Sequence, residues 1–72
     1  MLDMKAFGCR IASLRRNARL KQKDIAECCK VSIQAVSKWE TGRSCPDLLI
    51  LNDLARALGV EIKDLFDEES VG

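Results

Sequence analysis

The sequence predicts an all-α protein, a compact five-helix bundle. Apolar residues recur at spacings of three and four in successive segments, which is the period of an amphipathic helix. Gly42, Pro46 and Gly59 stand between these segments, where helices end and loops begin. The chain has 72 residues, 47% of them hydrophobic and 32% charged, which is typical of one soluble globular domain.

Three helices are expected in the first half of the chain. The first covers residues 4–18, with Asp3 as its N-cap and with Gly8 leaving room for another helix to approach closely. The second covers residues 22–29, and the third covers residues 33–40 after a Ser32 cap. The residues expected on their buried sides are Met4, Phe7, Ile11, Leu14, Ala18, Ile25, Ala26, Cys29, Val36 and Trp39.

Two further helices are expected after a loop at residues 41–44. Pro46 suits the first turn of a fourth helix over residues 47–58, and Gly59 suits the left-handed cap that ends it. A last short helix is expected over residues 62–66. The inner sides of these two helices are predicted to carry Leu48, Leu51, Leu54, Ala55, Leu58, Ile62, Leu65 and Phe66. The domain therefore covers residues 1–66, followed by a short acidic tail over residues 67–72 that we expect to be frayed.

The charges are divided between the two halves of the chain, although the net charge is only +1. Residues 1–46 hold ten basic and four acidic residues, a net charge of +6, whereas residues 47–72 hold two basic and seven acidic residues, a net charge of −5. A basic half suits a one-sided contact with a polyanion, because phosphate affinity depends on local charge. An ordinary solvated surface explains the same division equally well.

The four cysteines favour a small apolar role over chemistry. Cys9, Cys28, Cys29 and Cys45 include no C-x-x-C pair and the chain has no histidine, so we expect no metal site, no cofactor and no enzyme activity. Neighbouring helical positions point about 100° apart, so Cys28 and Cys29 are expected to divide between surface and core. Free thiols, with neither a signal peptide nor a membrane span in the sequence, predict a cytoplasmic protein.

The third expected helix has one apolar side for packing and one polar side with hydrogen-bonding groups for binding. With Val36 and Trp39 turned inward, the side chains of Gln34, Ser37, Lys38 and Thr41 form one outward stripe that contains no acid. An amide can bind the edge of adenine through two hydrogen bonds, an ammonium can reach guanine or a phosphate, and Ile33 can touch a thymine methyl. These groups suit a reader of the DNA major groove, although a solvated helix face that lacks carboxylates would look the same.

The run from Gln22 to Gly42 closely resembles the helix-turn-helix of the XRE and phage repressor/Cro family. It contains the segments QKDIA, at residues 22–26, and VSIQAVSKWETG, at residues 31–42. The match continues through Pro46-Asp47, Leu54-Ala55, Leu58-Gly59-Val60 and Leu65-Phe66, so it covers about residues 5–66. Agreement of several separated segments in both residue type and spacing makes the resemblance highly specific.

The resemblance implies a DNA-binding domain whose second helix crosses the backbone and whose third helix enters the major groove. Phosphate contacts then set the register and base contacts choose the sequence. The positions that match the family's base-facing residues are Ser32, Ile33, Gln34, Ser37 and Lys38. Those expected at the DNA backbone are Gln22, which is also expected to brace Gln34, together with Thr41, Arg43, Arg19, Lys21 and Lys23. The family also implies a buried ion pair between Arg15 and Glu40.

Three positions depart from the family pattern. Arg19 and Lys30 stand where the family commonly has glycine, and a left-handed conformation there costs a non-glycine residue about 1 kcal/mol. Lys21 replaces the usual Ser or Thr cap of the second helix, which weakens that cap by about 1 kcal/mol. The added positive charge beside Gln22 favours DNA affinity in return.

The predicted function is a sequence-specific DNA-binding regulator, either a repressor or an antitoxin-like autoregulator. A protein-interaction module on the same scaffold is the alternative, because a fold alone does not prove a function. Leu49 and Ile50 point away from the inner side of the fourth helix, so they are candidates for the interface of a homodimer on a palindromic site. Isolated aliphatic side chains are also common on monomer surfaces.

Overall fold

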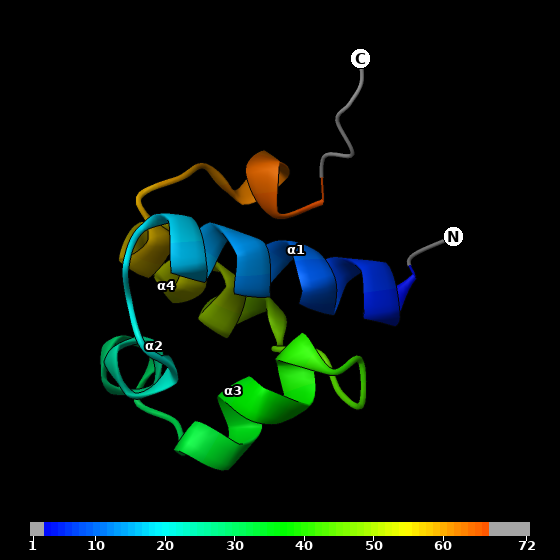
Figure 1. The fold of residues 1–72 in the computed structure, drawn as a ribbon, viewed down its shortest axis with the longest axis horizontal. Helices are drawn as coiled ribbons and strands as arrows, with labels where there is room; N and C mark the ends of the chain where they lie inside the picture. Colours follow the sequence, from blue (N-terminus) through cyan, green and yellow to red (C-terminus); the bar gives the residue numbers. More distant parts are fainter. Residues whose placement is uncertain (1–2, 67–72) are drawn as a thin grey trace.

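Four α-helices and one 3-10 helix make up the computed structural model, which describes residues 3–66. They are α1 (Met4–Asn17), α2 (Gln22–Cys29), α3 (Ile33–Glu40), α4 (Leu48–Leu58) and the 3-10 helix η1 (Ile62–Leu65). In Figure 1, α1 runs across the molecule, with α2 and α3 on one side of it and η1 on the other. The expected tail, residues 67–72, lies outside the described residues.

The fifth expected α-helix is wrong in type. Its hydrogen bonds join residues three apart, from Asp64 N–H to the Glu61 carbonyl (2.9 Å) and from Phe66 N–H to the Lys63 carbonyl (3.2 Å). The element has only four residues, and the tighter 3-10 helix is the form that such short helical pieces commonly take. The fold is therefore all-helical, as predicted, with four α-helices rather than five.

Side-chain caps fix where most helices begin. The Asp3 carboxylate accepts hydrogen bonds from the backbone of Lys5 and Ala6, and the Ser32 hydroxyl accepts one from Ala35. Asp47 caps α4 by accepting from Ile50 N–H, so that helix begins one residue later than expected, and Pro46 lies before the cap rather than in the first turn. Each cap satisfies backbone donors that a helix start leaves without an intrahelical partner.

Among residues 3–66, two non-glycine residues adopt the left-handed conformation at the ends of helices. Arg19 has φ 62° after α1, and Lys30 has φ 59° at the end of α2. These are the two positions at which the sequence departs from the family's glycines. Lys21, the N-cap of α2, makes no side-chain cap, but its backbone N–H donates to the Asp24 carboxylate at 2.8 Å.

One core joins all five elements. Its least exposed large side chains are Ile25 of α2, Val36 of α3, Leu54 of α4 and Leu65 of η1. The remaining members are Phe7, Ile11, Cys29, Trp39, Ala26, Ala55 and Leu58. Because α3 contributes Val36 and Trp39 to this core, the orientation of its opposite face is fixed by packing.

Four residues expected in the core are exposed. Leu48 is 79% exposed because it opens α4 at the edge of the packed region, and Ala18 lies beyond the last residue of α1. Ile62 and Phe66 are each 41% exposed, although one face of the Phe66 ring stacks on Phe7 at a centroid distance of 5.1 Å. The helical period predicts which side of an element faces inward, but not which of its residues lie beyond the edge of the core.

Ile50 is half-buried and packs against the core, contrary to the expectation that it has no place there. The next residue toward the N-terminus, Leu49, is 82% exposed. Cys28 and Cys29 divide between surface and core as the sequence predicts. Within residues 3–66, no helix is both long and apolar enough to cross a membrane.

Candidate nucleic-acid interface

The outward face of α3 carries the polar stripe that the sequence predicts. Gln34, Lys38 and Thr41 are exposed and Ser37 is half-buried, while Val36 and Trp39 are buried on the opposite side of the helix. Ile33 is also exposed, at the first turn. The stripe therefore offers an amide, an ammonium, hydroxyls and an apolar group to one surface, with no carboxylate among them.

Ser32 combines a capping role with a free donor. Its Oγ accepts the backbone N–H of Ala35 at 3.1 Å, and the residue is exposed. A hydroxyl that accepts in this way keeps its own hydrogen for another partner. The cap therefore leaves Ser32 able to donate to a DNA oxygen at the start of α3.

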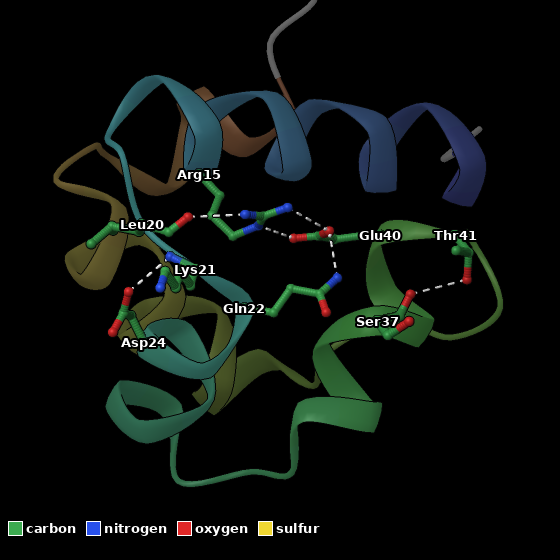
Figure 2. Close-up of polar contacts among 8 residues, drawn as sticks. All are labelled: Arg15, Leu20, Lys21, Gln22, Asp24, Ser37, Glu40 and Thr41. Carbon is green, nitrogen blue, oxygen red and sulfur yellow. Dashed lines mark hydrogen bonds and ion pairs between the residues drawn. The ribbon is translucent and has the colours of Figure 1, made fainter.

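Thr41 is used differently from what the sequence suggests. Its hydroxyl donates to the carbonyls of Ser37 (3.0 Å) and Lys38 (3.3 Å), the first of which is drawn in Figure 2. A hydroxyl has one hydrogen, and a phosphodiester can only accept, so Thr41 can bind a phosphate only by giving up these bonds. In the structure Thr41 closes the end of α3, and its DNA contact stays a prediction.

The loop after α3 is held to the helix by its backbone. The N–H groups of Arg43 (2.9 Å) and Ser44 (3.4 Å) both donate to the Lys38 carbonyl, and that of Gly42 donates to the Trp39 carbonyl at 3.2 Å. The Arg43 side chain is exposed. An ordered loop thus places a permanently charged guanidinium beside the stripe on α3.

An ion pair joins α1 to the end of α3, where the family resemblance predicts one. Arg15 Nε lies 2.7 Å from Glu40 Oε2, and Arg15 Nη2 donates to Oε1 at 3.2 Å. The side chains are 14% and 8% exposed, so both charges are largely removed from water. Arg15 also donates to the carbonyl of Leu20 (2.9 Å), which ties the loop before α2 to the same group (Figure 2).

Gln22 joins this network rather than bracing Gln34. Its Nε2 donates to Glu40 Oε1 at 2.9 Å (Figure 2). Within residues 3–66, Gln22 makes no hydrogen bond to Gln34. The expected brace is therefore wrong for this structure. One of the two amide hydrogens of Gln22 is left over for a phosphate.

The Gln22–Glu40 bond could not be found in the sequence. The two residues are 18 positions apart and belong to different helices, so no local period relates them. The hydrogen bond from the Arg15 guanidinium to the Leu20 carbonyl is also not predicted by residue types, because any residue could supply that carbonyl. The Gln22–Glu40 bond follows from the tertiary arrangement of α2 and α3.

The other basic side chains predicted at the backbone lie free on the surface. Arg19, Lys21 and Lys23 are exposed, and Arg15–Glu40 is the single ion pair among residues 3–66. Arg19 and Lys21 lie in the loop before α2, and Lys23 lies in its first turn. The N-terminus of α2 thus carries several cations close to Gln22.

Comparison with known proteins identifies the family to which this architecture belongs. The sequence profile of a family described as helix-turn-helix matches residues 11–65, which include α2, the turn and α3. The chain belongs to the XRE-type helix-turn-helix family. The matched range of this XRE-type domain also includes every member of its core except Phe7.

Two relatives illustrate the similarity. An uncharacterized HTH-type transcriptional regulator, y4dJ of Sinorhizobium fredii, is 38% identical over 65 residues, which cover 89% of this XRE-type chain and 84% of y4dJ. The HTH-type transcriptional regulator DdrOP3 of Deinococcus deserti is 36% identical over 58 residues, covering 81% of this chain. The chain spans 45% of the length of DdrOP3 and 32% of that of another curated relative.

A solved structure shows the same arrangement. The restriction-modification controller protein C.AhdI of Aeromonas hydrophila superposes with a TM-score of 0.84 at 31% identity, and the match covers 89% of this chain and 97% of C.AhdI.

Proposed function

We propose that this chain is a sequence-specific DNA-binding transcription regulator that inserts α3 into the major groove. The observation that carries the proposal is the division of α3 into two faces. Val36 and Trp39 fix one face in the core, and the opposite face presents Gln34 and Lys38 with no acid beside them. A rigid helix with such a face has the groups that recognise base edges.

The proposal assigns two kinds of contact. Base reading falls to Ser32, Ile33, Gln34, Ser37 and Lys38, which lie on or at the start of α3. Backbone binding falls to Gln22 and Arg43 and to the free cations Arg19, Lys21 and Lys23. Membership of a family of DNA-binding regulators supports this assignment, as do relatives named transcriptional regulators.

We also propose repression or autoregulation as the mode of action and homodimerisation as its basis. The adjacent exposed side chains of Leu48 and Leu49 open α4 and support a contact with a second copy. A two-fold dimer would bind a palindrome whose half-sites lie about 10 to 10.5 base pairs apart. A cytoplasmic location fits the free cysteines. A non-enzymatic role fits the family.

A mobility shift with random-sequence duplex at low salt tests the proposal. DNA binding predicts a shifted band that weakens steeply as salt rises, because each phosphate contact releases counterions. Absence of any shift at low salt, with the protein folded by circular dichroism, would instead favour the protein-interaction alternative. Selection of bound duplexes from a random pool would then identify the operator.

A further inference from the structure

We propose that Lys5 binds the DNA backbone, forming with Arg43 a single phosphate-binding edge at the end of α3. The inference rests on the proposed function and adds a residue from α1 to the binding surface. It follows from the way in which α1 crosses α3 and from the geometry at Gly42.

One side of α1 faces α3 along its length. Lys5, Gly8, Ala12 and Arg15 follow at spacings of three and four, so they share this side. A Cβ at Gly8 would lie 2.3 Å from the Trp39 carbonyl oxygen, Ala12 is buried, and Arg15 binds Glu40. Lys5 is the exposed outer member of the series.

Lys5 lies directly against the loop that carries Arg43. A Cβ at Gly42 would lie 2.9 Å from Lys5 Cα and 3.3 Å from Lys5 Cβ, and Gly42 has φ +79°. The two backbones therefore touch at a residue without a side chain. Figure 1 shows the first turn of α1 and the loop after α3 at the same end of the molecule.

Side chains, not backbone amides, must supply phosphate binding in this loop. The N–H groups of Thr41, Gly42 and Arg43 all donate to carbonyls of α3, which also fixes the loop relative to the groove-reading face. Besides Lys38 of the stripe on α3, the exposed cations at this loop are Arg43 and Lys5, and neither of these two forms an ion pair within residues 3–66.

Asp3, the acidic residue near Lys5, does not form an ion pair with the Lys5 side chain. Asp3 Oδ1 accepts the backbone N–H groups of Lys5 (3.0 Å) and Ala6 (3.2 Å), which holds this carboxylate at the helix start. The Lys5 ammonium, on a long flexible stem, can then extend toward a phosphate that Arg43 also contacts.

The test measures the DNA affinity of wild type, Lys5→Gln, Arg43→Gln and Lys63→Gln between 50 and 200 mM salt. Each protein is measured on one selected duplex and on random duplex. Lys63 is an exposed lysine on η1, across α1 from α3, and serves as the matched control. A lost phosphate contact lowers the magnitude of the salt slope by about 0.9. The ratio of the wild-type affinity to the Lys5→Gln affinity should therefore fall about 3.5-fold as salt rises over this range, on both duplexes.

Arg43→Gln should show the same behaviour, and Lys63→Gln should keep the wild-type slope. A Lys5→Gln variant that binds DNA with the wild-type slope, while Arg43→Gln loses slope, overturns the inference and leaves the proposed function intact. Failure of folded wild type to bind any duplex removes the proposed function and the inference together.

Discussion

Gly8 lies where α1 passes over the last residues of α3. A Cβ built at this position would be 2.3 Å from the Trp39 carbonyl oxygen and 2.7 Å from that of Glu40. Both neighbours are backbone atoms, so they cannot move aside as a flexible side chain can. The absence of a side chain at residue 8 thus sets the distance at which α1 packs on α3.

Gly8→Ala should lower the free energy of unfolding by about 1 to 3 kcal/mol, because the added methyl overpacks this crossing. Urea unfolding followed by circular dichroism measures the change. Ser13→Ala, on the exposed side of the same helix, should stay within about 0.5 kcal/mol of wild type. Equal stability of Gly8→Ala and wild type would show that the two helices separate freely.

Cys29 shows how burial changes the chemistry of one of two adjacent thiols. Burial, with smaller contributions from Asp53 and Cys28, raises the pKa of Cys29 from 9.0 to about 11. The neutral thiol is thus favoured in the folded state, which agrees with a small apolar role in the core.

This pKa shift predicts a loss of stability in alkali. The contribution of neutral Cys29 is complete below about pH 9 and is lost as pH rises toward about 11, because the unfolded thiol ionises first. The free energy of unfolding should fall over this range by about 2 to 3 kcal/mol more in wild type than in Cys29→Ala. Parallel pH profiles for the two proteins would contradict the assignment.

The network around Glu40 connects helices rather than residues of one helix. Arg15 reaches Glu40 from α1 and Gln22 reaches it from α2, so one carboxylate at the end of α3 holds both neighbours (Figure 2). This arrangement fixes the angle between the two helices of the helix-turn-helix. It also orients the amide of Gln22, which we propose at the DNA backbone.

Glu40→Ala should destabilise the protein by about 3 kcal/mol, because it leaves the largely buried Arg15 guanidinium without its partner. Thermal or urea unfolding gives the value. Glu27→Ala, which removes an exposed acid from α2, should change stability by less than about 0.5 kcal/mol. A Glu40→Ala protein as stable as Glu27→Ala would mean that the ion pair contributes nothing.

Local chemistry made the helices predictable. Asp3, Ser32 and Gly59 act at helix ends as their residue types suggest, and the 3.6-residue period placed Val36 and Trp39 in the core. The outward stripe of α3 follows directly from that period.

Tertiary contacts account for what the sequence did not reveal. Gln22 pairs with Glu40 because the turn at Lys30 folds α2 back against α3, which no spacing encodes. Leu48 and Ile62 are apolar and in phase with the core, yet they lie beyond its edge. The role of Thr41 as a helix-end cap depends on hydroxyl geometry that the sequence alone leaves open.

The surface of the domain is asymmetric in charge and in apolar exposure. The basic half of the sequence supplies α1, α2, α3 and the loop with Arg43, whereas the acidic half supplies α4 and η1. Leu48 and Leu49 lie at the junction of the two halves, at the start of α4. We propose that a second copy covers these two side chains.

Leu49→Glu should therefore weaken dimerisation, because it places a charge in the proposed apolar contact. Sedimentation of the free protein and of its complex with a selected site measures the stoichiometry. Ser13→Glu, which adds the same charge on the exposed side of α1, should behave like wild type. One wild-type protein per duplex at saturation, on a site without inverted symmetry, would exclude the dimer.

The sequence preference of Gln34→Ala tests the insertion of α3 into the groove most directly. Binding of wild type, Gln34→Ala and Arg43→Ala is measured on the selected duplex, on its single base-pair variants and on random DNA. Gln34→Ala should lose about 1 to 3 kcal/mol of binding free energy on the best site, and it should lose the sequence preference at one base pair. Arg43→Ala should instead weaken binding to every duplex. If both variants instead lose affinity equally on selected and random DNA, α3 does not read bases through Gln34.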